Sequence, residues 1–175
     1  MSKERELALQ AFHILNGLLG DLIAAAQVRR CYARASEEGK IRHETFLCVS
    51  RMCLSTLILV LCKWLEFYDH FHSVIPDDCH TAANQLGREI RRRSVRPFRN
   101  KVVGHIWDKN ADRPLTNEEI ERSINAIVRD DPEAFVSWCA SPAANFPDSV
   151  ASIVEHTRSR IEAEFEISDA ELFPG

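Results

Sequence analysis

Apolar residues recur every three or four positions along most of this chain, the spacing that places them on one side of an α-helix. The first such pattern predicts a helix over residues 4–36, and the second predicts a helix over residues 42–71. The second pattern has the wider apolar face, so we expect that helix to be the more buried. Because no stretch shows strand alternation of useful length, the predicted fold is all-α: a bundle built on two long antiparallel helices, with shorter helices added.

Glycine, proline and hydrogen-bonding side chains predict where these helices begin and end. Gly39 suits the left-handed residue that follows a helix, so we expect it to terminate the first one. Gly17 and Gly20 weaken the middle of that helix and make it a candidate for a kink. The run Pro76-Asp77-Asp78 is expected to open a third helix, capped by a carboxylate, that continues to about Arg93.

The second half of the chain predicts several shorter helices. Ser94 suits the N-cap of a fourth helix, which carries Pro97 in its first turn and is expected to continue to Trp107. The remaining helices are predicted to start at the capping box Thr116-x-x-Glu119, at Asp131-Pro132 and at Pro147. We expect one helical domain over residues 1–167 and a frayed tail over residues 168–175.

Composition is typical of a cytoplasmic globular protein. The contents of 45% hydrophobic and 27% charged residues are ordinary for a soluble domain, and the first residues lack the apolar core of a signal peptide. The longest apolar run, Leu57–Cys62, is too short to cross a bilayer, so we expect no membrane contact. The six cysteines form no Cys-x-x-Cys pair, which favours buried thiols in a reducing compartment over a disulfide framework.

Charge is distributed unevenly along the chain. The formal net charge is −4, yet residues 88–101 hold seven basic residues and one acid and carry +6, which leaves −10 elsewhere. A basic segment on an acidic body predicts a local anion site rather than general coating by nucleic acid. Arg92, Arg96 and Lys101 are the candidates for contact with RNA phosphates, the alternative being a solvated helix face. Arg92 and Arg96 align only if one helix continues through Ser94.

The same segment contains Arg99-Asn100 and, after four further residues, His105, a set that can support proton transfer at a phosphate. A guanidinium fork binds phosphate oxygens, an imidazole moves a proton near neutral pH, and the Asn100 amide can orient either group. On one helix Arg99 and His105 point about 120° apart, so they border a groove or meet the same pair of a second copy across a two-fold axis. On spacing alone the commoner explanation is structural, with Arg99 in an ion pair and His105 in an ordinary hydrogen bond.

The stretch Val95–His105 resembles the signature of the HEPN superfamily, and in particular its abortive-infection branch. The resemblance implies an all-α, metal-independent endoribonuclease of an antiphage or toxin–antitoxin system, with a composite site in a homodimer. It implies that Arg99 binds the scissile phosphate, that His105 transfers a proton and that Asn100 orients one of them, with no cofactor. The partners that it implies are single-stranded RNA, a second copy of the chain and an antitoxin or regulatory protein.

Two other readings stay open. Some HEPN domains are inactive and serve as nucleotide-, RNA- or protein-binding modules, and a plain helical interaction protein could carry such a short motif by chance.

Trp107 stands where toxins of the family often have a tyrosine, so control by nucleotidylation at this position is not expected. His70, His72, Cys79 and His80 are of zinc-ligand types, but their spacing is unusual for structural zinc, so no metal site is expected.

Overall fold

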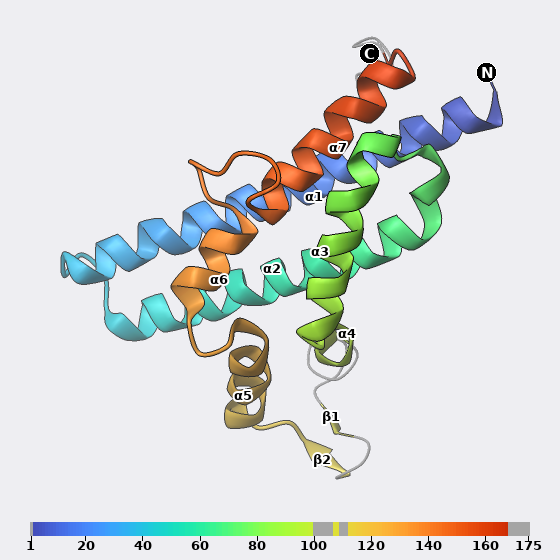
Figure 1. Cartoon of the computed structure of the whole chain (residues 1–175). Helices are drawn as coiled ribbons and strands as arrows, with labels where there is room; N and C mark the ends of the chain where they lie inside the picture. The colour runs from blue at the N-terminus through green and yellow to red at the C-terminus, as the bar shows by residue number, and fades with distance from the viewer. Residues whose placement is uncertain (1, 100–106, 109–111, 168–175) are drawn as a thin grey trace, which may run out of the picture.

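The computed structural model describes residues 2–99, 107–108 and 112–167, and its fold is the predicted all-α bundle (Figure 1). Helix α1 (Lys3–Glu37) and helix α2 (His43–Phe71) are joined by a short turn and lie antiparallel, side by side. The bounds of both helices agree with the predicted ones to within one residue. The two long helices form the frame on which the shorter elements pack.

The shorter elements cover one side and one end of this frame. In chain order they are the 3-10 turns η1 (His72–Val74) and η2 (Asp77–Cys79), α3 (His80–Arg92), α4 (Val95–Phe98), β1 (Trp107–Asp108), β2 (Arg113–Pro114), α5 (Asn117–Val128), α6 (Pro132–Cys139) and α7 (Val150–Glu164). Helix α7 packs along α1, α3 packs on α2, and α6 touches both long helices. Strands β1 and β2 form a two-residue antiparallel ladder.

The core follows the contact between α1 and α2. Leu15 and Leu22 of α1 and Leu57, Leu61 and Trp64 of α2 are fully buried. Their spacing of three, four or seven positions places each group on one helical face, as the sequence pattern predicts. Burying one such leucine contributes about 1.5–3 kcal/mol relative to leaving it exposed, so the leucines of this contact stabilise the fold substantially.

Among the described residues, α1 and the segment His43–Val74 are long and apolar enough to cross a membrane, judged by length and composition alone. The core helices of a globular bundle have the same property. Here the buried sides of the two helices face each other and the shorter helices.

Local signals at several helix ends are confirmed. Gly39 follows α1 with φ at +67°, the left-handed conformation that glycine adopts without steric cost. Helix α1 continues without interruption through Gly17 and Gly20. Helix α5 begins with the predicted capping box: Thr116 Oγ1 accepts the Glu119 N–H at 3.3 Å, and Glu119 Oε2 accepts the Thr116 N–H at 2.9 Å. These ends depend on residues close in sequence, which is why spacing alone predicts them.

The start of α3 differs from the prediction. The chain first makes the turn η2, and α3 begins only at His80. Asp78 does not cap this helix, because its Oδ2 accepts a hydrogen bond from Arg160 Nε of α7 at 2.8 Å. The carboxylate therefore ties η2 to α7, where a charged donor makes a stronger bond than a helix N–H offers.

The fourth helix also differs from the prediction. Helix α4 begins at Val95 as expected, but Ser94 has φ at +55° and, within the described residues, its side chain does not cap the helix. This left-handed residue breaks the line from α3 to α4, so Arg92 and Arg96 do not continue one helical face. Trp107, expected at the end of the same helix, lies instead in β1, where its backbone pairs with β2.

Candidate functional site

Arg99 is the part of the predicted catalytic motif that the structure describes. It directly follows α4, which Val95 and Phe98 anchor through side chains that are at most 3% exposed. The Cys62 thiol of α2 adds a hydrogen bond to the Val95 carbonyl at 3.4 Å. The Arg99 side chain is 43% exposed and forms an ion pair with Glu66 of α2. Helix α4 thus holds this guanidinium at the surface above the second half of α2.

The other members of the motif, Asn100 and His105, lie outside the described residues, as does the predicted RNA-binding residue Lys101. Their roles stay predictions.

Two further arginines approach α2 beside Arg99. Asp69 Oδ2 accepts a hydrogen bond from Arg96 Nη2 at 2.9 Å, and Asp69 Oδ1 accepts one from Arg91 Nη2 at 3.4 Å. We call Arg91, Arg96 and Arg99, with their partners Glu66 and Asp69, the arginine cluster. Its side chains are all 43–54% exposed. Three guanidinium groups against two carboxylates leave the cluster with a formal charge of +1, and ion pairs so exposed contribute only about 0–1 kcal/mol each.

Arg92 is exposed but does not join the arginine cluster. It borders a groove of about 270 Å³ between the α3–α4 turn and α5, whose apolar wall includes Phe98 and Ile127. The left-handed Ser94 separates it from Arg96, so the two predicted RNA-binding arginines face different surroundings. Of the predicted site residues that the structure describes, only Arg96 and Arg99 come together.

Arg93 has a structural role that sequence reasoning did not find. Its side chain is only 11% exposed, and its guanidinium carbon lies 4.4 Å from the centroid of the Trp138 ring. Arg93 Nη1 donates to the Ile127 carbonyl at 2.9 Å, and Nε donates to Glu89 Oε1 at 3.1 Å. Arg93 therefore holds the end of α3 against α5 and α6. Three consecutive arginines must splay around a helix, but spacing does not say which one turns inward.

Arg29 is a second arginine whose role only the structure shows. It is only 4% exposed. Its Nε donates to Ser50 Oγ of α2 at 3.0 Å, and its Nη1 pairs with Glu133 Oε1 of α6 at 2.6 Å. A buried guanidinium needs such partners because leaving it unpaired costs several kcal/mol. Arg29 thus joins three helices and is not part of an anion site.

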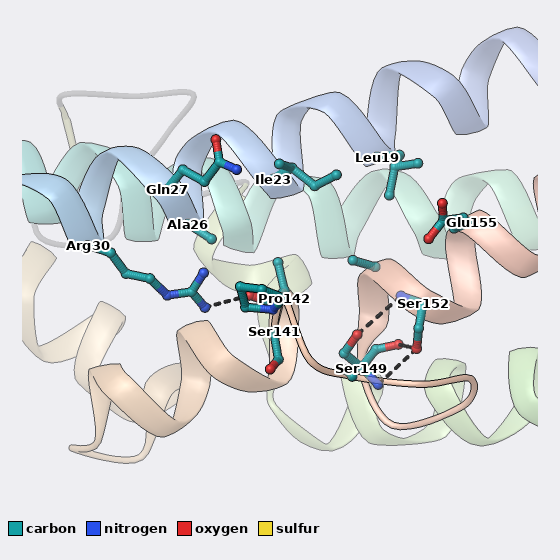
Figure 2. A pocket seen from close by; sticks show the side chains of 13 residues that line it. Leu19, Ile23, Ala26, Gln27, Arg30, Ser141, Pro142, Ser149, Ser152 and Glu155 are labelled. Atoms are coloured by element: carbon teal, nitrogen blue, oxygen red, sulfur yellow. Dashed lines mark hydrogen bonds between the residues drawn. The ribbon is translucent and has the colours of Figure 1, made fainter.

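A pocket of about 260 Å³ lies between α1 and the connection from α6 to α7 (Figure 2). Leu19 and Ile23 of α1 form an apolar wall, and Arg30 donates to the Ala140 carbonyl at its edge. The hydroxyls of Ser149 and Ser152 are engaged in capping α7, which begins at Val150 and not at Pro147 as predicted. No predicted site residue that the structure describes lines this pocket. The Ser149 and Ser152 side chains therefore serve the start of α7.

The histidines and the cysteine that cluster in sequence over residues 70–80, where no metal site is expected, lie in different surroundings in the structure. The rings of His72 and His80 stack at 4.5 Å, and His70 Nδ1 lies 2.8 Å from the Glu66 carbonyl. Cys79 turns away from these histidines and lies with Asp78 and His156. Among the described residues this trio is the group whose ligand atoms are close enough to share a metal ion.

Comparison with known proteins shows the fold but no family. No family model matches the chain, and no curated protein matches its sequence. Its structure is similar to that of the integron cassette protein Vpc_cass2 from the mobile metagenome of V. paracholerae. The TM-score is 0.75 at 20% sequence identity, over 89% of this chain and 95% of the other. The TM-score shows that the two chains share a fold.

Proposed function

We propose that this chain is a metal-independent endoribonuclease of the HEPN type, acting in an antiphage (abortive-infection) or toxin–antitoxin system of the cytoplasm. Arg99 binds the scissile phosphate, His105 transfers a proton and Asn100 orients one of these groups. The observation that carries the proposal is the position of Arg99, a half-exposed guanidinium beside Arg91 and Arg96 at the end of α4.

The surroundings of Arg99 suit a phosphate ligand. Its carboxylate partner Glu66 is 50% exposed, so the ion pair is weak and screened by salt. A phosphate can replace a carboxylate on the same guanidinium, because both accept two parallel hydrogen bonds from the guanidinium N–H groups. The extra positive charge of the arginine cluster favours that exchange.

The chemistry follows from these residue types. The substrate's 2′-oxygen forms a bond to phosphorus as the bond from phosphorus to the 5′-oxygen breaks, which leaves a 2′,3′-cyclic phosphate and a 5′-hydroxyl. The 2′-hydroxyl loses its proton and the leaving 5′-oxygen gains one. An imidazole with a pKa near 6.5 can serve either transfer, which is worth roughly 10²- to 10⁴-fold in rate. Arg99 neutralises the charge that develops on the phosphate oxygens.

A second copy of the chain completes the site in this proposal. One copy supplies a single Arg99 and a single His105. These are few groups for binding a phosphate and transferring two protons. A two-fold axis near α4 supplies both residues twice. Light scattering at micromolar protein tests this arrangement, and a strictly monomeric chain contradicts the composite site.

A catalytically inactive HEPN module that binds a nucleotide, RNA or a partner protein is the second candidate. The pairing of Arg99 with Glu66 favours it, because a carboxylate then occupies the guanidinium that cleavage requires. This candidate predicts RNA binding without cleavage.

A plain helical interaction protein is the third candidate. A groove of about 380 Å³ between α1 and α2 is lined by Val28, Tyr32 and Met52. All three side chains are exposed, Met52 at 68%. Exposed apolar side chains gathered at one groove favour contact with another protein. This candidate predicts a complex that Met52→Glu disrupts and that Arg99→Ala leaves intact.

RNA cleavage in EDTA separates these candidates. We expect the purified chain to cut single-stranded RNA in EDTA and to leave the end groups described above. Arg99→Ala and His105→Ala should each abolish cleavage and stay folded, and Asn100→Ala should have a milder effect. Arg34→Ala removes one exposed positive charge from the far end of α1 and is the matched control.

The outcomes of this assay are distinct. Cleavage that persists in His105→Ala, or that requires a divalent ion while the protein stays folded, contradicts the proposal. RNA binding with no cleavage by any variant supports the inactive module. Absence of RNA binding together with a Met52-dependent complex supports the interaction protein.

A further inference from the structure

Three side chains of metal-ligand type meet where η2 packs on α7. Asp78 and Cys79 lie in η2, and His156 lies in α7, 77 positions later in the chain than Cys79. One ligand atom from each residue lies within 4.8 Å of the other two, and the Cys79 thiol is 3.7 Å from Asp78 Oδ1. The site is at the opposite end of α3 from the arginine cluster (Figure 1).

We propose that Asp78, Cys79 and His156 bind a divalent metal ion of the zinc class, which holds η2 against α7. Thiolate, imidazole and carboxylate are the ligands that zinc prefers, and three protein ligands leave a fourth position for water. Around a tetrahedral zinc ion such ligand atoms lie about 3.3–3.6 Å apart, given metal–ligand bonds of about 2.0–2.3 Å. The three ligand atoms therefore need to move only slightly closer together to bind an ion.

Neighbouring groups orient two of the three ligands. Arg160 Nε holds Asp78 Oδ2 at 2.8 Å, while Oδ1 faces the Cys79 thiol. The carboxylate can thus bind an ion through one oxygen and keep its arginine on the other, an arrangement that fixes its direction. The His156 ring stacks on Phe146 with centroids 3.9 Å apart, which restrains the imidazole in the same way.

The surface outside the trio is suited to a cation. An open hollow of about 390 Å³ borders Asp78, and its charged lining consists of Asp77, Asp78, Glu164 and Arg160. Three carboxylates against one guanidinium give this hollow a formal charge of −2, which raises the local concentration of cations. The ion would reach Cys79 from the Asp78 side, since that carboxylate is half exposed and the thiol is fully buried.

Binding requires one proton to leave. Burial and the adjacent Asp78 raise the pKa of the Cys79 thiol to about 11, so the thiol carries its proton at neutral pH when no ion is bound. The sulfur–metal bond forms as that proton passes to solvent, and no electron is transferred. Zinc favours this loss of the proton, because its positive charge stabilises the thiolate more strongly than it stabilises the protonated thiol.

Cobalt(II) titration of the full chain tests the site, because a thiolate bound to cobalt gives a charge-transfer band in the near ultraviolet. The background should be the Cys31→Ser/Cys48→Ser double variant, which removes both exposed thiols. After treatment with EDTA and dialysis, we expect one equivalent of CoCl₂ to produce that band and the visible bands of a tetrahedral ion. One equivalent of ZnCl₂ should abolish both sets of bands.

Variants assign the ligands. Cys79→Ser should lose the charge-transfer band, and His156→Gln should weaken zinc binding at least tenfold in competition with a chromophoric chelator. Cys53→Ser, which changes a buried thiol in α2, is the matched control and should keep the band. His156 is only half-buried, so His156→Gln tests the site even if Cys79→Ser fails to fold.

The site is overturned if the background protein shows no charge-transfer band, if the band persists in Cys79→Ser, or if His156→Gln binds zinc as tightly as the parent. None of these measurements uses RNA, so the result is independent of the proposed ribonuclease activity. If EDTA and Cys79→Ser each remove cleavage together with the folded structure, the ion serves stability, because the site lies apart from Arg99.

Discussion

The guanidinium carbon of Arg93 lies 4.4 Å from the centroid of the Trp138 ring, so the residue that follows α3 stacks on an aromatic side chain of α6. Two hydrogen bonds, to the Ile127 carbonyl and to Glu89, complete its surroundings. A cation over an indole contributes about 0.5–2 kcal/mol, and each hydrogen bond of a charged group about 1.5–3 kcal/mol. Arg93 therefore links the end of α3 to α5 and α6.

We expect Arg93→Ala to lower the free energy of unfolding by about 2–4 kcal/mol, because it removes the stacking contact and the hydrogen bond to the partly buried Ile127 carbonyl. Arg92→Ala, one position earlier and exposed, should change it by no more than about 0.5 kcal/mol. Urea unfolding followed by circular dichroism measures both. Equal effects of the two variants would show that Arg93 is merely a solvated residue.

Glycines within and just after α1 give a second, paired prediction on stability. Gly17 and Gly20 lie inside a continuous helix, and a Cβ added at either would meet no atom within 4 Å. Gly17→Ala should therefore raise the free energy of unfolding by about 0.5–1 kcal/mol. Gly39 has equal space but φ at +67°, so Gly39→Ala should lower it by about 1–2 kcal/mol. Thermal unfolding should shift in opposite directions for the two variants, and a shift in the same direction would contradict the assigned conformations.

Glu119 predicts a pH dependence at the start of α5. Hydrogen bonds from Arg113 and then from the Thr116 N–H lower the pKa of this carboxyl to about 2. Its unfolded value is near 4.3, so the charged form stabilises the fold above that pH, and the contribution is lost as pH falls from about 4.3 towards 2. Glu119→Gln should destabilise the protein at pH 7 and match the parent near pH 2.

The measurement for Glu119 is the urea midpoint of parent and variant across pH 2–7. Glu118→Gln removes the same charge from the same helical turn and is the control. A difference between parent and Glu119→Gln that is constant over this range would contradict the assigned pKa shift.

Asp69 gives a prediction that depends on RNA binding. Asp69 pairs with both Arg91 and Arg96, so Asp69→Asn should free both for phosphate. RNA affinity should rise about fivefold at low salt, if the change removes about 1 kcal/mol of competition. Arg96→Ala should weaken binding and flatten the dependence of log K on log salt by about 0.7 for a single-stranded ligand. Arg92→Ala should act in the same direction.

Binding measured over a salt series tests the Asp69 prediction. Asp21→Asn, which removes the partner of Lys63 from α1, is the control for a simple change of net charge. If Asp69→Asn and Asp21→Asn raise affinity equally, the arginine cluster has no special part in binding. An unchanged salt slope in Arg92→Ala or Arg96→Ala would show that the altered arginine is merely solvated.

The amino-acid sequence by itself determined the class of fold and most helix ends. Periodic apolar positions predict α1 and α2, and the pair Thr116 and Glu119 predicts the start of α5. These features depend on residues within about one or two turns of each other, so they can be read from spacing. Gly39 belongs to the same class, since its left-handed conformation is a local preference.

Only the tertiary structure decided which side chains meet. Three consecutive arginines look alike in sequence, yet Arg93 turns inward because Trp138 of α6 packs at that point. The left-handed Ser94 separates Arg92 from Arg96, and Cys79 meets His156 of α7 in place of its sequence neighbour His80. Such contacts depend on how helices distant in the chain pack against one another. The free energy of that packing is a property of the whole bundle, so no single segment of the sequence determines it.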